Sequence, residues 1–265
     1  SPELWSSLTN DPRKLFLNRA IQGTYPPAST FKIVTAIAAL EEGMVRPDET
    51  LPFVGGLQFG GRFFHCWREG GHGRIKLHEA LAQSCDSYFY QLGLRLGVDR
   101  IAKYARRLGL GELTGIDLDR EKSGLIPSSE WKKKVFGEEW QAGENLSIAV
   151  GQGYDTVTPI QNALMIAQVA NGGRPIRPHL VKEVRDADGE VIFKEEIKKD
   201  KGISISPETL KEIRAALADT VASPFGTAYG IRSQTVTIGG KTGTAQVISE
   251  EGRRRASGAG SRANL

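Results

Sequence analysis

A serine and a lysine stand three residues apart in the stretch from Ser29 to Lys32, directly after prolines at positions 26 and 27. Residues 33–40 are apolar except for one threonine, which predicts a helix that is buried on every side. Because a helix can begin just after prolines, Ser29 and Lys32 should lie one turn apart at its N-terminal end. Burial and the helix dipole disfavour a lysine cation there, and a neutral amine beside a serine hydroxyl is a base beside a nucleophile. The ordinary alternative is a capping serine followed by a solvated lysine.

Two more short motifs follow along the chain. Ser84-Cys85-Asp86 interrupts a helical pattern that begins near Ile75 and ends at Gly97. Lys241-Thr242-Gly243-Thr244 follows residues 235–238, whose sequence Thr-Val-Thr-Ile predicts a strand. A hydroxyl that donates and accepts suits a proton relay, and a lysine beside hydroxyls suits a bound carboxylate. Each motif alone has an ordinary interpretation, since Ser84 could cap a helix and the lysine motif could be a turn.

Together the three motifs have the order S-x-x-K, S-x-D and K-T-G, and the chain therefore resembles the penicillin-binding transpeptidases and serine β-lactamases. The resemblance runs from about Asn10 to Val247 and is strongest to class B penicillin-binding proteins of the elongation-specific type, penicillin-binding protein 2. It is carried by residues 18–27, 151–154 and 226–228 in addition to the motifs. Asp86 replaces the commoner asparagine of the wider family, and aspartate at this place is a feature of that type.

The resemblance implies a role for each motif residue in acyl transfer. Ser29 would be the nucleophile, Lys32 the base, and Ser84 the relay that carries a proton to the leaving amine. Asp86 would stabilise the cationic form of Lys32, and its ordinary alternative is a cap for a helix that starts at Ser87. The backbone N–H groups of Ser29 and Thr244 would stabilise the oxyanion. The carboxylate of a D-Ala-D-Ala stem peptide would be held by Lys241, Thr242 and Thr244, and Gly243 would let the substrate backbone come close to the strand.

Cys66 and Cys85 are the only cysteines, and His72 lies between them. Thiolates and imidazole are the usual ligands of zinc, whereas two cysteines in an oxidising compartment suggest a disulfide. The sequence around Cys66 and His72 resembles a metal-binding segment of some penicillin-binding protein 2 sequences. We expect a structural zinc ion that holds the 44–73 segment against the active-site helix, with a disulfide or free thiols as alternatives. A fourth ligand would come from Asp48, Glu49, His65 or water.

The resemblance implies an α+β penicillin-binding transpeptidase or serine β-lactamase-like fold, with a helical subdomain packed on a five-stranded antiparallel sheet. Two of those strands would precede the Ser29 helix and two would follow the Lys241 motif, and the chain has too little sequence for either pair. We therefore expect a truncated transpeptidase domain over 1–247 with an incomplete sheet, and a disordered tail over 248–265. Such a fragment is expected to be poorly active alone.

The rest of the pattern predicts local elements. Residues 1–28 are polar and turn-rich, and 44–73 are rich in glycine and aromatic residues and should be irregular. Turn signals at Asp188-Gly189 predict a hairpin over 181–193. Further helices are predicted over 98–108, 158–170 and 206–221, and a loop followed by a short lysine-rich helical piece over 114–140.

Composition narrows the class of protein. The 265 residues carry a formal charge of +4 and are 39% apolar, which is ordinary for a globular domain. No basic stripe with interleaved aromatic residues is present, so no nucleic-acid partner is expected. The chain does not begin with Met and shows no signal peptide or apolar run long enough for a membrane span. We interpret it as a piece of a longer protein, the periplasmic domain of an inner-membrane-anchored protein whose anchor lies outside this chain.

Three functions compete at this stage. The first is a peptidoglycan D,D-transpeptidase of cell elongation, a target of β-lactams, with a membrane glycan polymerase and rod-shape proteins as partners implied by the resemblance. The second is a serine D,D-carboxypeptidase or β-lactamase, although no asparagine has the glutamate four residues before it that a class A lactamase uses. The third is a non-catalytic β-lactam receptor or scaffold, which shares these motifs.

Overall fold

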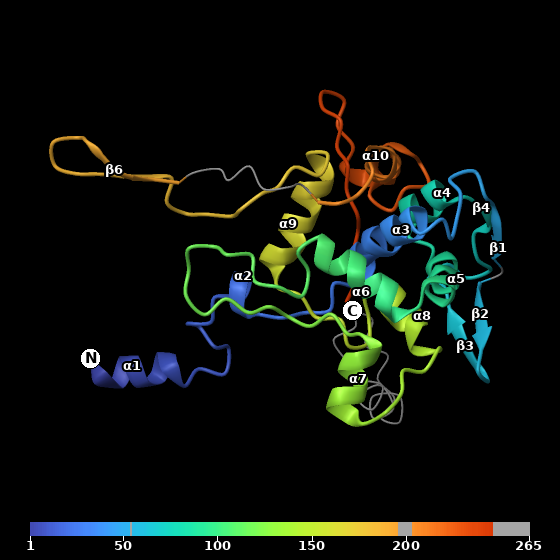
Figure 1. The fold of residues 1–265 in the computed structure, drawn as a ribbon, viewed down its shortest axis with the longest axis horizontal. Helices are drawn as coiled ribbons and strands as arrows, with labels where there is room; N and C mark the ends of the chain where they lie inside the picture. The colour runs from blue at the N-terminus through green and yellow to red at the C-terminus, as the bar shows by residue number, and fades with distance from the viewer. Residues whose placement is uncertain (54, 196–202, 246–265) are drawn as a thin grey trace.

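The computed structural model describes residues 1–53, 55–195 and 203–245 (Figure 1). Its helices are α1 (Pro2–Thr9), α2 (Arg19–Gln22), the 3₁₀ helix η1 (Ala28–Phe31), α3 (Lys32–Glu41), α4 (Leu77–Ala82), α5 (Asp86–Leu96), α6 (Val98–Arg107), α7 (Ser129–Phe136), α8 (Glu144–Ala149), α9 (Pro159–Ala170), α10 (Pro207–Ala222) and the 3₁₀ helix η2 (Tyr229–Ile231). Its strands are β1 (Leu51–Phe53), β2 (Gly56–Phe59), β3 (Arg62–His65), β4 (Gly73–Ile75), β5 (Glu183–Arg185) and β6 (Val191–Lys194).

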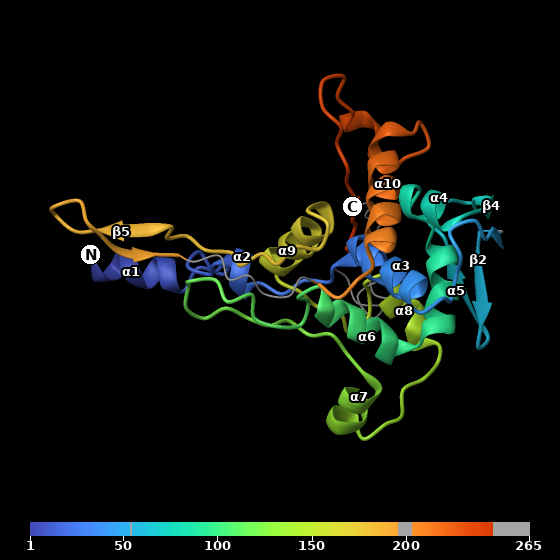
Figure 2. The ribbon, with the colours of Figure 1, turned by 45° about the horizontal axis from the view of Figure 1, so that its top comes forward.

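Helix α3 lies at the centre of the hydrophobic core, as its uniformly apolar sequence predicts. Every residue from Lys32 to Ala39 is buried, and α4, α5, α6 and α10 pack around it (Figures 1 and 2). The one polar side chain in its middle, Thr35, donates a hydrogen bond of 2.8 Å to the carbonyl of Ala149 in α8. Burial of the Thr35 hydroxyl costs little free energy, because the hydroxyl has a hydrogen-bond partner. Helix α3 is therefore packed on every side and supports the residues at its N-terminal end.

Helices whose ends carry strong capping signals form where the sequence predicts them. The side chains of Thr158 and Ser206 accept hydrogen bonds from backbone N–H groups in the first turns of α9 and α10, and proline follows each cap. The helical pattern after Ile75 divides into α4 and α5, with Ser84 and Cys85 between them. The predicted hairpin around Asp188-Gly189 is confirmed as β5 paired antiparallel with β6.

The prediction that 44–73 is irregular was wrong. Strand β1 pairs antiparallel with β4, and β2 pairs antiparallel with β3, so the segment folds as two small sheets beside α5. Glycines interrupt the alternation on which strand prediction depends, and each strand has only three or four residues. The polar N-terminal segment also contains regular structure, because Ser1 caps α1 and Pro2 occupies its first position.

The predicted strand over 235–238 is also wrong. Among the described residues the sheets are all two-stranded, and none of them pairs with this segment. A strand needs a neighbour for its backbone N–H and C=O groups, and none of the described strands pairs with residues 235–238. The helices with small antiparallel sheets nevertheless make the described chain a mixed α+β structure. The tail predicted over 248–265 lies outside the described residues.

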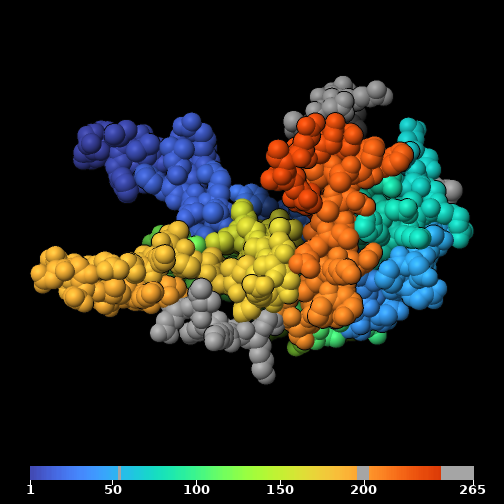
Figure 3. Space-filling view, turned by 90° about the horizontal axis from the view of Figure 1, so that it is seen from above, coloured from blue at the N-terminus to red at the C-terminus, as the bar shows by residue number. Residues whose placement is uncertain are grey.

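Helix α1 and the β5–β6 hairpin extend away from the helical core (Figures 2 and 3). Large apolar side chains are exposed along both, including Trp5, Ile192 and Phe193. In the described part of the chain, no helix combines the length and apolarity that a membrane span requires. The motif residues lie in the helical part, away from these extensions.

Candidate active site

The first motif lies where η1 passes directly into α3. Ser29 is half-buried in η1, and Lys32 begins α3 with its backbone N–H bonded to the carbonyls of Ser29 and Thr30. Ala28 has a positive φ of 51°, and its N–H donates to the carbonyl of Gly151 at 2.9 Å. The residue before the candidate nucleophile is thus held in a rare conformation by a second segment, which is common where a reactive group must be aimed.

Lys32 brings the first two motifs together. Its side chain is fully buried, and its Nζ donates to the carbonyl of Ser84 at 2.9 Å, to the Ser84 Oγ at 3.1 Å and to the Asp86 Oδ1 at 2.6 Å. The residue that caps α5 is Cys85, and Asp86 is the first residue of that helix. Neither Ser84 nor Asp86 is therefore a helix cap, and both of their side chains face the amine of Lys32.

The third motif lies against η1 and α10 although it is not in a strand. The N–H of Gly240 donates to the carbonyl of Leu217 at 3.0 Å, which fixes the start of the segment on α10. A Cβ on Gly243 would lie 3.3 Å from the side chain of Thr30, a tight contact that would require Thr30 to shift slightly. The alternative that residues 241–244 form only a turn does not account for this contact with the first motif.

Thr227 connects the third motif to the second. Its Oγ1 lies 2.8 Å from the Oγ1 of Thr242, and its backbone N–H donates to the carbonyl of Ala82 at the end of α4 at 3.2 Å. One sequence signal marked this position, the similarity of residues 226–228 to penicillin-binding proteins, but that similarity did not indicate the contact.

Lys241 lies close enough to Lys32 for their charges to repel. Its Nζ donates to the carbonyl of Thr242 at 3.1 Å. Desolvation and, to a smaller extent, the charge of Lys32 lower the pKa of Lys241 to about 7, and the charge of Asp86 partly opposes them. An arriving carboxylate would favour the cation of Lys241, which is the interaction that substrate binding at this motif requires.

The three motifs line one cleft of about 670 Å³, a size typical of small-molecule sites. Ser29, Ser84, Asp86, Thr242, Gly243 and Thr244 contribute to its walls, together with Val150, Gln152 and Thr227. A further wall carries His65, Cys66, Trp67 and Tyr90. Lys32 lies beneath the cleft rather than in its lining. The roles of the Ser29 and Thr244 N–H groups toward an oxyanion stay predictions.

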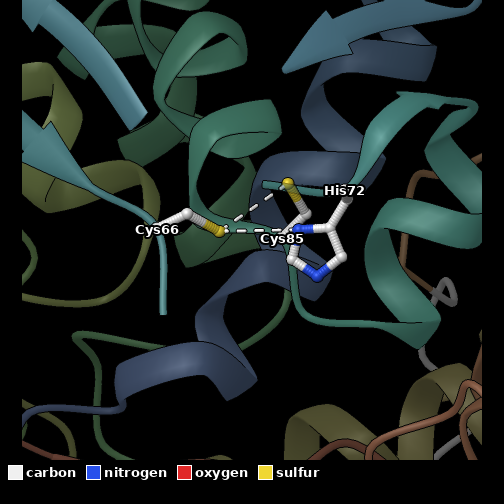
Figure 4. Close-up of side chains that lie close together, drawn as sticks. All are labelled: Cys66, His72 and Cys85. Atoms are coloured by element: carbon white, nitrogen blue, oxygen red, sulfur yellow. Dashed lines mark hydrogen bonds between the residues drawn. The ribbon is translucent and has the colours of Figure 1, made fainter. Parts of the chain in front are cut away.

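Cys66, which is part of this wall, lies together with His72 and Cys85, and the three side chains point toward one another (Figure 4). The two Sγ atoms are 4.0 Å apart, and the Cys66 Sγ is 3.6 Å from the His72 Nδ1. The hydrogen bond between the two sulfurs lowers the pKa of Cys66 and raises that of Cys85. The buried Nε2 of His72 has no hydrogen-bond partner among the described residues.

The protein residues considered as a fourth ligand are engaged elsewhere. Asp48 pairs with Arg46, and Glu49 accepts a hydrogen bond of 3.1 Å from Arg95. The ring of His65 stacks edge-on against Phe63. Within the described residues, the ligand cluster therefore contains three protein side chains, and water is the candidate that remains for the fourth position.

Comparison with known proteins agrees with this geometry. Residues 5–262 match the family model of the penicillin-binding protein transpeptidase domain. The chain belongs to the penicillin-binding protein transpeptidase family. Peptidoglycan D,D-transpeptidase MrdA of Acinetobacter baumannii is 37% identical over 262 residues, which cover 94% of this chain and 37% of that protein.

Solved structures of penicillin-binding proteins share the fold. The complex between penicillin-binding protein 2 and MreC from Helicobacter pylori matches with a TM-score of 0.82 at 31% identity, covering 93% of this chain and 45% of that one. A peptidoglycan synthase complex, described for its coordination of polymerization and crosslinking, matches with a TM-score of 0.81 at 39% identity, covering 95% of this chain and 42% of that one. These similarities confirm the predicted fold and the resemblance to penicillin-binding protein 2. The chain spans less than half the length of each of these relatives.

Proposed function

We propose that this chain carries the catalytic site of a peptidoglycan D,D-transpeptidase that acts through an acyl-enzyme on Ser29. The observation that carries the proposal is the buried amine of Lys32, bonded to Ser84 and Asp86 beneath a cleft that Ser29 lines. A relay hydroxyl and a base are thereby fixed by the core rather than by mobile surface side chains. The third motif supplies the hydroxyls of Thr242 and Thr244 in the cleft wall, and the amine of Lys241, which is not in that lining, lies next to them in the chain.

Ser29, Lys32 and Ser84 carry out successive steps of the proposed reaction. The Oγ of Ser29 attacks the carbonyl carbon of the penultimate D-alanine, and its proton passes to the neutral amine of Lys32. The C–N bond then breaks, and the terminal D-alanine leaves as an amine that receives the proton through Ser84. The amine of a second stem peptide attacks the acyl-enzyme, loses a proton by the same route, and releases Ser29. A β-lactam would stop the sequence at the acyl-enzyme.

Covalent labelling with a fluorescent penicillin tests the proposal. We expect the wild-type chain to be labelled and Ser29→Ala to be unlabelled, because only the Ser29 hydroxyl can form the acyl bond. Ser147→Ala, in α8 outside the cleft lining, is a control that should be labelled like wild type. If wild type is not labelled, the same pair of variants is tested in a longer form of the protein. Absence of labelling there too would overturn the proposal and favour the receptor or scaffold function.

We also propose a structural zinc ion at Cys66, His72 and Cys85. Tetrahedral zinc with bonds of about 2.3 Å to sulfur and about 2.0 Å to nitrogen places its ligand atoms roughly 3.6–3.8 Å apart. The 3.6 Å and 4.0 Å separations between these side chains fit that requirement, and all three ligand atoms lie within 4.8 Å of one another. The 4.0 Å between the sulfurs is about twice the length of a disulfide bond. The ion would link the end of β3 to the turn before α5.

Metal analysis tests the zinc proposal. Protein purified without chelator is expected to contain about one zinc per chain, and Cys66→Ser or His72→Ala should reduce that content severely, because each removes one of three protein ligands. His179→Ala is the matched control, since that histidine is exposed and bonds only to a backbone carbonyl. Zinc far below one per chain in the wild type would leave the two cysteines as free thiols or a disulfide.

The substrate, partners and location follow from the same proposal. The substrate is a stem peptide ending in D-Ala-D-Ala, and serine D,D-carboxypeptidase activity would differ only in the use of water as acceptor. A glycan polymerase and rod-shape proteins are proposed as partners, supported by relatives solved with MreC and in a peptidoglycan synthase complex. Such a domain would work in the periplasm, as part of a protein anchored in the inner membrane.

A further inference from the structure

Trp67 is an exposed aromatic residue whose N–H groups are nevertheless both bonded. Its side chain is 61% exposed on the wall of the cleft. The indole Nε1 donates to the carbonyl of Ser84 at 3.0 Å and to that of Gln83 at 3.1 Å, and the backbone N–H donates to the Asp86 Oδ2 at 3.1 Å. A surface tryptophan that served only as packing would not need these three directed contacts.

The groups that Trp67 holds are the same ones that hold Lys32. The carbonyl of Ser84 accepts from the indole and from the Lys32 Nζ. Asp86 uses Oδ1 for Lys32 and Oδ2 for the Trp67 backbone. Lys32 and Trp67 therefore both donate hydrogen bonds to the Ser84–Asp86 turn, Lys32 from the core and Trp67 from the surface.

The turn itself needs such support. Ser84 has a positive φ of 55°, a left-handed conformation that is unfavourable for a non-glycine residue. In this conformation its carbonyl can accept from both Lys32 and Trp67, while its Oγ faces the Lys32 amine. If the surface contacts were lost, the turn could relax and move the Ser84 hydroxyl and the Asp86 carboxylate relative to Lys32.

We propose that Trp67 is a positioning residue of the transpeptidase site. Its indole N–H holds the carbonyl of Ser84, so that the strained turn presents the Ser84 hydroxyl and the Asp86 carboxylate to Lys32. The proposal rests on the proposed function, since it concerns the relay and base of that reaction. Because Trp67 follows the candidate zinc ligand Cys66, the same peptide joins the metal cluster to the relay.

Trp67→Phe separates the hydrogen bonds from the rest of the residue. In the wild type the rings of Trp67 and His72 meet edge-on, with their centroids 5.4 Å apart. Phenylalanine keeps an aromatic ring beside His72 and the backbone N–H that donates to Asp86, but it removes the indole donor. Trp140→Phe is the matched control, because its indole donates 2.7 Å to the Asn145 Oδ1, outside the cleft lining. Both variants lose one indole hydrogen-bond donor.

The acylation rate constant and the non-covalent dissociation constant for a penicillin are measured separately, in the form of the protein that fluorescent penicillin labels. We expect Trp67→Phe to lower the acylation rate constant roughly 10- to 100-fold, as small misplacements of reacting groups do, with the dissociation constant nearly unchanged. Trp140→Phe should leave both constants at the wild-type values. Equal acylation rate constants in the two variants would overturn the inference, whereas failure of the wild type to be labelled would count against the proposed function.

Hydrogen exchange provides a readout that does not depend on activity. The N–H groups of Ser84 and Cys85 donate to the carbonyls of Leu81 and Ala80, so a loosened turn should exchange them faster. We expect faster exchange in a peptide covering 80–87 for Trp67→Phe and wild-type exchange for Trp140→Phe. Unchanged exchange in Trp67→Phe would show that the indole does not hold the turn.

Discussion

Lys32→Met is expected to lower the rate of acylation by a β-lactam roughly 100- to 10,000-fold, the range that a positioned acid–base group contributes. Methionine has a similar length and fills the buried site, but it has no nitrogen to accept the proton of Ser29. The Ser84 hydroxyl and the Asp86 carboxylate would lose their shared partner as well. Stopped-flow measurement of covalent labelling gives the rate constant directly.

Lys132→Met is a matched control for the loss of a buried ammonium group. The Lys132 side chain is only 4% exposed, and its Nζ lies 2.7 Å from Glu144, so this variant also breaks an enclosed ion pair. It lies outside the cleft lining and should acylate at the wild-type rate. If Lys32→Met acylates as fast as Lys132→Met, then Lys32 is not the base.

Gly151→Ala is expected to destabilise the fold by roughly 2–5 kcal/mol, through a left-handed backbone and an overpacked contact together. Gly151 has a φ of 72°, and a Cβ there would lie 2.2 Å from the carbonyl oxygen of Ala28 and 2.6 Å from the Cβ of Phe31. Both are in or beside η1, so the added methyl group would push against the helix that carries Ser29. Urea unfolding measures the change.

Gly137→Ala separates the two contributions. Gly137 has the same φ of 72° at the end of α7, but a Cβ there would meet no atom within 4 Å. This variant should lose only the backbone contribution, roughly 1–2 kcal/mol. Similar losses of unfolding free energy in both variants would show that the contact with η1 is not tight. A larger loss in Gly151→Ala should be accompanied by slower labelling of Ser29.

Local signals predicted the helices that have strong caps or clear apolar periodicity, because both signals depend on neighbouring residues, whereas α1, α2 and α8 were not predicted. Thr158 and Ser206 with their following prolines fixed the starts of α9 and α10, and the apolar run after Lys32 fixed the buried helix. The segment 235–238 has strand-like residues, but a strand exists only if another one pairs with it. That condition depends on distant sequence, so the local pattern was misleading there.

The motif residues were predictable from the sequence, whereas their connections were not. The pattern placed Asp86 near Lys32, and the structure gives that contact at 2.6 Å. Trp67 and Thr227 were not predicted as parts of the site, because each acts on backbone carbonyls, which every residue has. The identity of a residue does not reveal whether its backbone carbonyl accepts a hydrogen bond from a distant side chain.

Thr227 joins walls of the cleft that come from distant parts of the chain. It holds the end of α4 through the Ala82 carbonyl and the Lys241 motif through the Thr242 hydroxyl. The width of the cleft opposite Ser29 is thus set in part by one short side chain outside the three motifs. Because Thr227 belongs to none of the three motifs, a substitution there would change how these two segments are held together without changing Ser29 or Lys32.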